Sequence, residues 1–189
     1  MSGVEFTIRR KILTVFGAKF HIYKPDGGLL GFCKQKAFRL REDIRIYTDE
    51  TMQKEKLRIA ARQILDFSAS YDVVESESER KIGTLRRKGL SSLFRDSWIV
   101  LDPQEAEIGR IQEDSTMLAV LRRVVDLGFW IPQTFHLYDH QSRELAQFRT
   151  HFNPFVHRMT VTVFPECPVD PLLVLAGGLV LMAVEGRQD

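Results

Sequence analysis

The sequence predicts a single, soluble, mostly-β domain over residues 1–189, with its apolar C-terminal segment buried as a core helix. Three observations predict it: a hairpin pattern that occurs four times, a β-branched run at 159–164 (MTVTVF), and an uncharged apolar stretch at 172–184. With 44% hydrophobic and 28% charged residues, the chain can both build a core and cover it. Folding at this length buries roughly 70% of the surface that the unfolded chain exposes.

Each copy of the hairpin pattern has an aromatic residue, two apolar residues and a polar turn starter, and closes with an apolar–small pair. The copies span 20–31, 71–83, 98–109 and 135–146. The segments inside them are rich in turn formers or charges, which indicates strand, turn and strand. We expect an aromatic residue of the facing strand to lie across the small closing residue of each copy (Gly31, Gly83, Gly109 and Ala146). Uneven spacing between the copies excludes a solenoid or a propeller.

Further strand-like runs lie between the copies. Residues 36–47 alternate around a polar turn at 41–43. Residues 55–67 alternate as well, but their types also favour helix; we interpret them as a strand because strands surround them. The total is about ten to twelve strands, enough for a barrel or a sandwich.

Two helices are predicted. Residues 114–128 form a short amphipathic helix, with Asp114 or Ser115 at its start and Gly128 at its end. In the tail, Asp170-Pro171 places an N-cap before a proline in the first helical position, and the helix that follows is apolar on every side. Its length of roughly 21 Å falls short of a hydrocarbon core of about 30 Å. A helix wrapped inside a closed sheet therefore fits better than the alternative, a tail that dips into a membrane.

Composition narrows the class of protein. Basic and acidic residues nearly balance, 27 against 25, so net charge gives no argument for nucleic acid. The N-terminus lacks the order of a signal peptide, and we expect a cytoplasmic protein. Cys33 and Cys167 fit free thiols in a reducing compartment, with a disulfide between them as the alternative.

The chain resembles the LURP-one-related and phospholipid-scramblase-like proteins, relatives of the Tubby C-terminal domain. The resemblance covers most of the chain and rests on an ordered series of segments that ends in the apolar tail: YDVV (71–74), KIGTLRRKGL (81–90), RDSW (95–98), IG (108–109), ED (113–114) and RR (122–123). It implies a closed antiparallel barrel of twelve strands around a buried hydrophobic C-terminal helix.

The resemblance also implies binding of phospholipid or phosphoinositide head groups, as a non-enzymatic module at a membrane surface. Two departures count against calcium-driven lipid scrambling. Residues 164–170 (FPECPVD) lack the dense oxygen ligands that calcium needs, and the cysteine-rich run used for lipidation is missing.

Basic clusters are the candidate lipid-binding residues. We expect Arg86, Arg87 and Lys88, together with Arg122 and Arg123, to contact phosphate groups. A third cluster stands at residues 9–11. The plain alternative is an ordinary solvated face, with these side chains paired to Glu77, Glu79 or Asp96.

The sequence indicates no catalytic residues, no cofactor and no metal. His136 and His140 flank a hairpin turn, so the geometry of helical metal ligands does not apply. Cys33 near His21 lacks an acid to orient the histidine, and a core cysteine is the simpler interpretation. Three hypotheses remain: a lipid-binding module, a regulatory barrel that binds a protein partner, and an enzyme whose site is assembled from distant residues.

Overall fold

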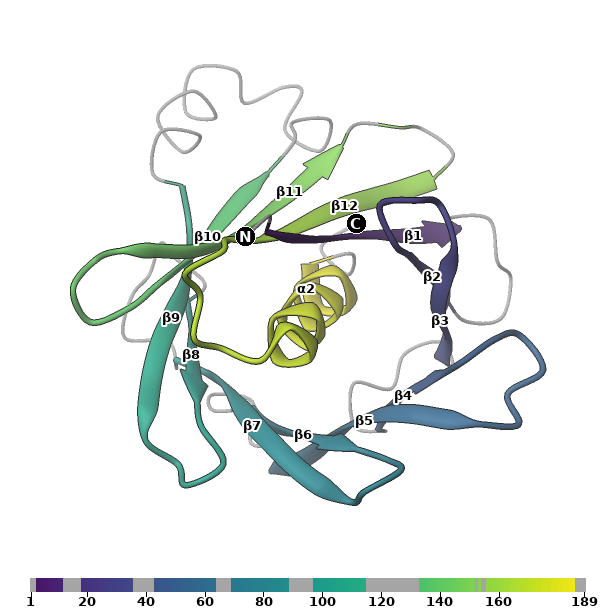
Figure 1. The fold of residues 1–189 in the computed structure, drawn as a ribbon, viewed down its shortest axis with the longest axis horizontal. Helices are drawn as coiled ribbons and strands as arrows, with labels where there is room; N and C mark the ends of the chain where they lie inside the picture. The colour runs from purple at the N-terminus through teal and green to yellow at the C-terminus, as the bar shows by residue number, and fades with distance from the viewer. Residues whose placement is uncertain are drawn as a thin grey trace.

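Twelve strands and one helix make up the part of the chain that the computed structural model describes, which is residues 3–11, 18–35, 43–63, 69–88, 97–114, 133–151, 153 and 156–185 (Figure 1). The elements are β1 (Val4–Lys11), β2 (Ala18–Tyr23), β3 (Leu29–Gln35), β4 (Ile44–Tyr47), β5 (Glu55–Gln63), β6 (Ser70–Glu75), β7 (Arg80–Arg87), β8 (Ser97–Leu101), β9 (Glu107–Glu113), β10 (Thr134–Tyr138), β11 (Glu144–His151), β12 (Val156–Val163) and α2 (Pro171–Glu185).

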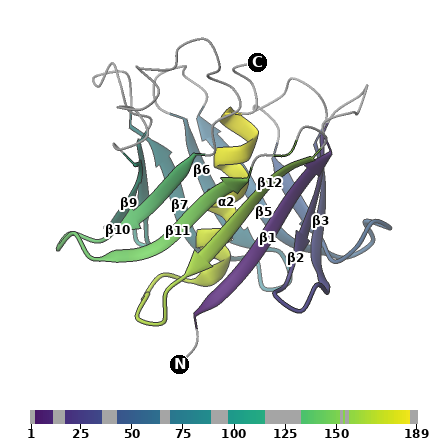
Figure 2. The same cartoon turned by 90° about the horizontal axis from the view of Figure 1, so that it is seen from above.

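Every strand pairs with its neighbour in sequence, and β1 pairs with β12 to close the barrel. All pairs are antiparallel, and the closing pair runs from Val4 opposite Val163 to Lys11 opposite Val156. The prediction of a mostly-β, closed antiparallel barrel is thereby confirmed. In such a meander the even-to-odd connections all lie at one end, which we call the hairpin end (Figure 2).

The four predicted hairpins are present as β2–β3, β6–β7, β8–β9 and β10–β11. Several of the hairpin turns start with an aspartate, whose side chain accepts hydrogen bonds from backbone amides later in the same turn. For example, Oδ1 of Asp102 accepts from the amides of Gln104 and Ala106 at 2.9 and 2.8 Å. Glu105 then takes a positive φ of 69°, which closes the turn.

The prediction that an aromatic residue lies across the small closing residue of each hairpin was wrong. Gly31, Gly83 and Gly109 lie opposite Ile22, Val73 and Val100, which are aliphatic and come two residues after the aromatic. A bulge in each hairpin shifts the register by one residue, and sequence spacing does not show it. At Gly83 the close neighbour is the helix, since an added Cβ would lie 2.5 Å from Cδ2 of Leu173.

The ambiguous segment at 55–67 forms strand β5 as far as Gln63, so the strand interpretation is confirmed for these residues. The β-branched run lies in β12. Two predicted elements lie outside the described residues. They are the strand before the turn at 41–43 and, apart from Asp114, the amphipathic helix at 114–128.

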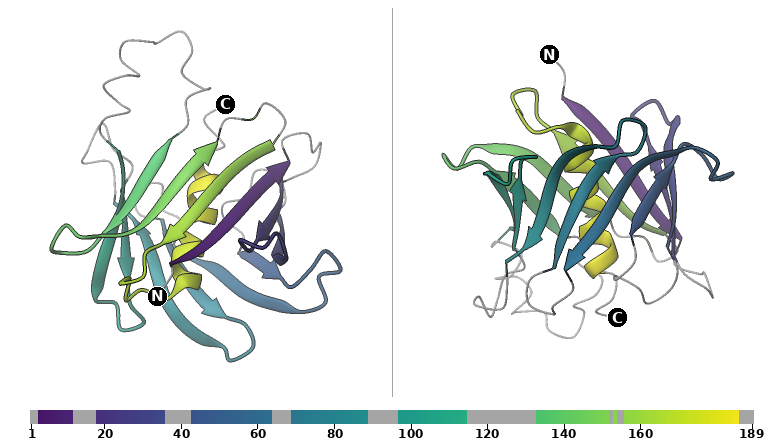
Figure 3. Two further views of the ribbon diagram at one scale, coloured as in Figure 1. Left: turned by 45° about the horizontal axis from the view of Figure 1, so that its top comes forward. Right: turned by 90° about the horizontal axis from the view of Figure 1, so that it is seen from below.

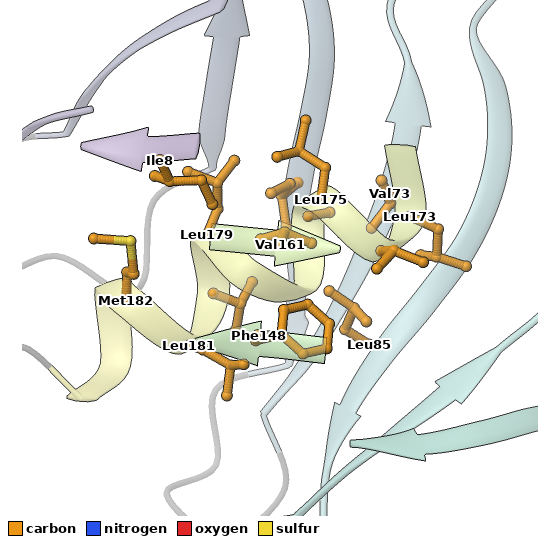
Figure 4. Close-up of a cluster of buried hydrophobic side chains, with 14 of the residues drawn as sticks. Ile8, Val73, Leu85, Phe148, Val161, Leu173, Leu175, Leu179, Leu181 and Met182 are labelled. Carbon is orange, nitrogen blue, oxygen red and sulfur yellow. The ribbon is translucent and has the colours of Figure 1, made fainter. Parts of the chain in front are cut away.

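Helix α2 begins where the sequence predicts, because Oδ1 of Asp170 accepts the amide of Leu172 at 2.9 Å. Its side chains from Leu173 to Met182, the two glycines aside, are at most 2% exposed. Figure 4 shows Leu179 beside Ile8 and Leu173 beside Val73. An added Cβ on Gly177 would lie 3.0 Å from Cδ1 of Ile111, so this glycine allows close approach of the sheet. No helix among the described residues is long and apolar enough to cross a membrane.

Candidate anion-binding surface

The three basic residues predicted at the end of β7 do not share one face. Successive strand residues point to opposite sides of a sheet. Arg86 therefore lies on the outside of the barrel, while Arg87, opposite Trp98, occupies an inward position at the end of the strand. Lys88 follows the strand and is exposed. Arg122 and Arg123 lie outside the described residues.

Arg86 belongs to an ion-paired network on the outer face of β5–β8. Glu105, carried by the β8–β9 turn, accepts from Arg62 and Lys81 and lies 3.3 Å from the Arg86 guanidinium. Asp72 adds a second carboxylate, 3.1 Å from the Lys81 ammonium. Hydrogen bonds from Arg62 and Lys81 lower the pKa of Glu105 from 4.5 to about 2. The Arg86 charge is therefore partly neutralised within the protein.

Two of the three acidic partners predicted for these residues, Glu77 and Glu79, pair with other cations, and the third, Asp96, lies outside the described residues. Glu77 lies 3.5 Å from Lys54, and Glu79 lies 2.9 Å from Arg58. Arg45, Arg110 and Arg143 are likewise paired with carboxylates. Ion pairing is thus common among the basic residues of β4–β9 and extends to the β10–β11 turn.

The opposite part of the wall carries a different arrangement, which we call the basic face. Five basic side chains project outward from strands that barrel closure brings together, and each strand contributes one: Arg9 on β1, Lys19 on β2, Lys34 on β3, Arg149 on β11 and Arg158 on β12. Four of them are exposed, and Lys19 is half-buried. Figure 1 shows β11, β12, β1, β2 and β3 in this order around one side of the barrel.

None of the five has a carboxylate partner within the ranges that the structure describes. Two like-charged pairs lie directly opposite each other across neighbouring strands, namely Arg9 with Arg158 and Lys19 with Lys34. Such pairs have Cβ atoms about 5 Å apart and destabilise a sheet. A bound anion would relieve this repulsion.

Other groups on this face suit a phosphate ligand. The Arg9 guanidinium lies 4.8 Å from the centre of the Tyr23 ring, which leaves its N–H groups at the surface. His151 lies opposite Arg158, and its Nε2 is 2.8 Å from Oγ1 of Thr160. Partial burial, followed by the charges of Arg149 and Arg158, lowers the pKa of His151. Guanidinium, ammonium and hydroxyl donors thus gather on this face. Two acids accompany them: Glu5, whose charge acts on His151, and Glu50, which pairs with His21.

Comparison with known protein families identifies the family of this chain. Residues 29–182 match the model of the LURP-one-related family. The chain belongs to this family. No curated protein matches the chain. The family match takes in β3 to β12 and most of α2, and so includes Lys34, Arg149 and Arg158 of the basic face.

Sequence reasoning found only part of the basic face in this LURP-one-related barrel. Residues 9–11 form a cluster in the sequence, but the barrel puts Arg9 outside and Arg10 at an inward position, next to Phe20. Arg149 and Arg158 stand alone in sequence and join Arg9 only through the pairing of β1 with β12 and of β12 with β11. The sequence feature that could have indicated this face is the alternation of basic with apolar residues in these strands, because it puts the basic side chains on the outside of the barrel.

The histidines and cysteines of the LURP-one-related barrel serve other contacts. His136 lies 2.7 Å from Glu144, and His140 lies 2.7 Å from the carbonyl of Glu107. His21 is on the outer face, 2.9 Å from Glu50, whereas Cys33 is in the core. Burial raises the pKa of the Cys33 thiol to about 12. Within the described ranges, no three His, Cys, Asp or Glu side chains are placed to hold a metal ion.

Proposed function

We propose that this LURP-one-related barrel is a non-enzymatic module that binds anionic phospholipid or phosphoinositide head groups through its basic face, at the cytoplasmic surface of a membrane. The observation that carries the proposal is a set of five cations that have no carboxylate partner among the described residues. Four of them form two pairs that directly oppose each other across neighbouring strands. A basic residue near an anionic membrane contributes about 1 kcal/mol to binding.

The proposal moves the main contact from Arg86 to the basic face. Arg86 already shares its charge with Glu105, so its transfer to a lipid phosphate would break an existing ion pair. Among the described residues no such pair is formed by Arg9, Lys19, Lys34, Arg149 or Arg158. Arg87, Lys88, Arg122 and Arg123 stay in the proposal as secondary contacts.

We further propose that the chain shares the scramblase-like and Tubby-like architecture in which α2 is the permanent core of the barrel and not a membrane anchor. The low exposure of its side chains supports this proposal. Of the two acids that precede α2, Asp170 is engaged as the helix cap. That engagement supports a lipid-binding role without calcium-driven scrambling.

Liposome co-sedimentation tests the lipid proposal, with neutral, phosphatidylserine-containing and phosphoinositide-containing vesicles at two salt concentrations. We expect salt-sensitive binding to the anionic vesicles, because screening weakens contacts between exposed charges. Replacing Arg149 and Arg158 together by glutamine should weaken binding about 30-fold, since roughly 2 kcal/mol is lost.

The matched control replaces Arg58 and Arg143 by glutamine, which removes the same charge from two ion-paired positions. Binding by this control should stay within about threefold of the wild type. Equal losses in the two variants would mean that only net charge matters. Absence of binding to every vesicle would refute the proposal and favour the alternative, a protein-interaction or regulatory barrel without a lipid ligand.

A further inference from the structure

A cavity of about 290 Å³ lies at the hairpin end, beside the start of α2. It is bordered by the first residues of β7, by the β8–β9 turn and by the connection from β12 to α2. Figure 3 shows these segments at the hairpin end of the barrel. None of the groups assigned to the basic face lines it. The cavity is therefore a separate feature of the barrel.

The floor of the cavity is apolar and firmly held. Ile82, Val169 and Leu173 line it and are at most 4% exposed, and half-buried Ile108 stands beside them. Leu173 is fixed from behind by the close approach of Gly83. The floor consists of packed core residues that are already held in one conformation. Binding of a side chain there therefore costs little conformational entropy in the protein.

Two prolines, Pro103 and Pro168, form exposed walls of the same cavity. Proline has a fixed φ and no N–H group, so these walls are stiff and offer no amide donor to a ligand. The cavity thus favours an apolar side chain over a polar or anionic group.

The charges at the mouth of the cavity favour a ligand in which basic residues flank the apolar side chain. Asp102 and Asp170 line the cavity. Arg80, the one cation among its described lining residues, lies 4.0 Å from Asp170 and 3.6 Å from Glu75. Acids outnumber bases in the surrounding connections, where Lys24, Lys54 and Arg143 are basic against Asp26, Asp49, Glu50, Glu77, Glu79, Glu105, Asp139 and Glu166. Several of these acids are paired with cations, as Glu79 is with Arg58 and Glu105 with Arg86, whereas Asp26 and Asp49 have no ion pair among the described residues. An anionic membrane would be repelled here.

We propose that this cavity, with Asp102 and Asp170 at its mouth, docks a basic segment of a protein partner by enclosing one apolar anchor residue. The anchor fills the floor between Ile82, Ile108 and Leu173, while lysine or arginine residues next to it face the acidic turns. The site acts independently of the basic face. The barrel then has two separate binding sites, one for an anionic membrane surface and one for a protein partner.

The test uses the intact, ¹⁵N-labelled protein and a synthetic probe, the peptide acetyl-Lys-Arg-Leu-Arg-Lys-amide, followed by amide chemical shifts without any vesicles. We expect saturable shifts centred on Ile82, Ile108 and Val169, with a Kd on the order of 1 mM for so short a peptide. The same peptide with alanine in place of leucine should bind about tenfold more weakly, because the anchor is lost.

A charge-matched pair of variants locates the site. Pro103→Lys with Pro168→Lys places two cations in the cavity wall and should weaken binding at least about tenfold. Pro25→Lys with Pro165→Lys adds the same charge at exposed prolines of the same end that do not line the cavity, and should cost less than about threefold.

Shifts spread over all the acidic turns and unchanged by the leucine-to-alanine replacement would overturn the proposal, since they would indicate general charge attraction. Absence of saturable shifts would overturn it as well. Because the comparison of the two peptides uses the wild-type protein, the result does not depend on the folding of the variants. It is also independent of any result with liposomes.

Discussion

Arg9 of β1 lies directly opposite Arg158 of β12 on the outside of the strand pair that closes the barrel. No carboxylate within the described residues compensates either charge. Like charges in this position work against the pairing on which closure depends. An anion bound at this closing seam, as proposed, would offset that repulsion.

Replacing Arg158 with threonine should stabilise the free protein while weakening its binding to anionic vesicles. Removal of the repulsion raises the free energy of unfolding by about 0.5 kcal/mol, and threonine also suits a strand. Urea unfolding measures the gain and co-sedimentation the loss. Arg58→Thr is the control, since it breaks the ion pair with Glu79 and should give no gain. A destabilised Arg158→Thr protein would show that the two arginines do not repel.

The Glu105 network should make stability depend on acid pH. The folded pKa of Glu105 is lowered from 4.5 to about 2, so its contribution is complete above about pH 4.5 and is lost as the pH falls towards 2. Glu105→Gln should therefore lower the melting temperature at pH 6 and flatten its decline between these pH values. Glu77→Gln, which removes a single exposed pair, is the control. Parallel melting curves for wild type and Glu105→Gln would contradict the network.

The contact between Gly83 and Leu173 should leave no room for a side chain. An added Cβ would lie 2.5 Å from Cδ2 of Leu173 and 2.6 Å from the carbonyl oxygen of Leu101, which cannot move without disturbing the sheet. Gly83→Ala should cost about 1–3 kcal/mol in the free energy of unfolding. Gly177→Ala is the comparison, because its nearest neighbour is the flexible end of Ile111 and the helix gains propensity. Equal effects would mean that Gly83 is not tightly packed.

A charge on the inner helix should abolish folding. Val180 and Leu175 are 1% and 2% exposed, so Val180→Asp or Leu175→Asp would bury an unpaired carboxylate. The cost of several kcal/mol is comparable to the whole stability of a domain. Circular dichroism should show loss of the β-sheet signal, whereas Leu175→Met should keep it. Soluble aspartate variants with unchanged melting would refute the role of α2 as the core.

Local features of the fold could be predicted from the sequence because they have local causes. The hairpins follow from alternating apolar residues and turn-forming aspartates, and the start of α2 follows from Asp170-Pro171. Register could not be predicted in the same way. The bulge between Val73 and Val74 moves Gly83 opposite an aliphatic residue, and no spacing in the sequence shows it.

The candidate surface was predicted less well because it depends on closure. Three adjacent basic residues look like a cluster in sequence, yet the pleat separates Arg86 from Arg87. Glu105 reaches Arg86 only because a turn folds back over the sheet. Arg149 and Arg158 meet Arg9 only after the first and last strands have paired.

That last pairing has a consequence during synthesis. A nascent chain carries Arg9 before any other strand of the barrel is made, but Arg149 and Arg158 leave the ribosome only with β11 and β12, and α2 follows later still. Contacts between segments so distant in sequence form late and slowly. Chains that stop short of β11 therefore lack both the assembled basic face and the filled interior, and β11, β12 and α2 must all be synthesised before the barrel can close around its core.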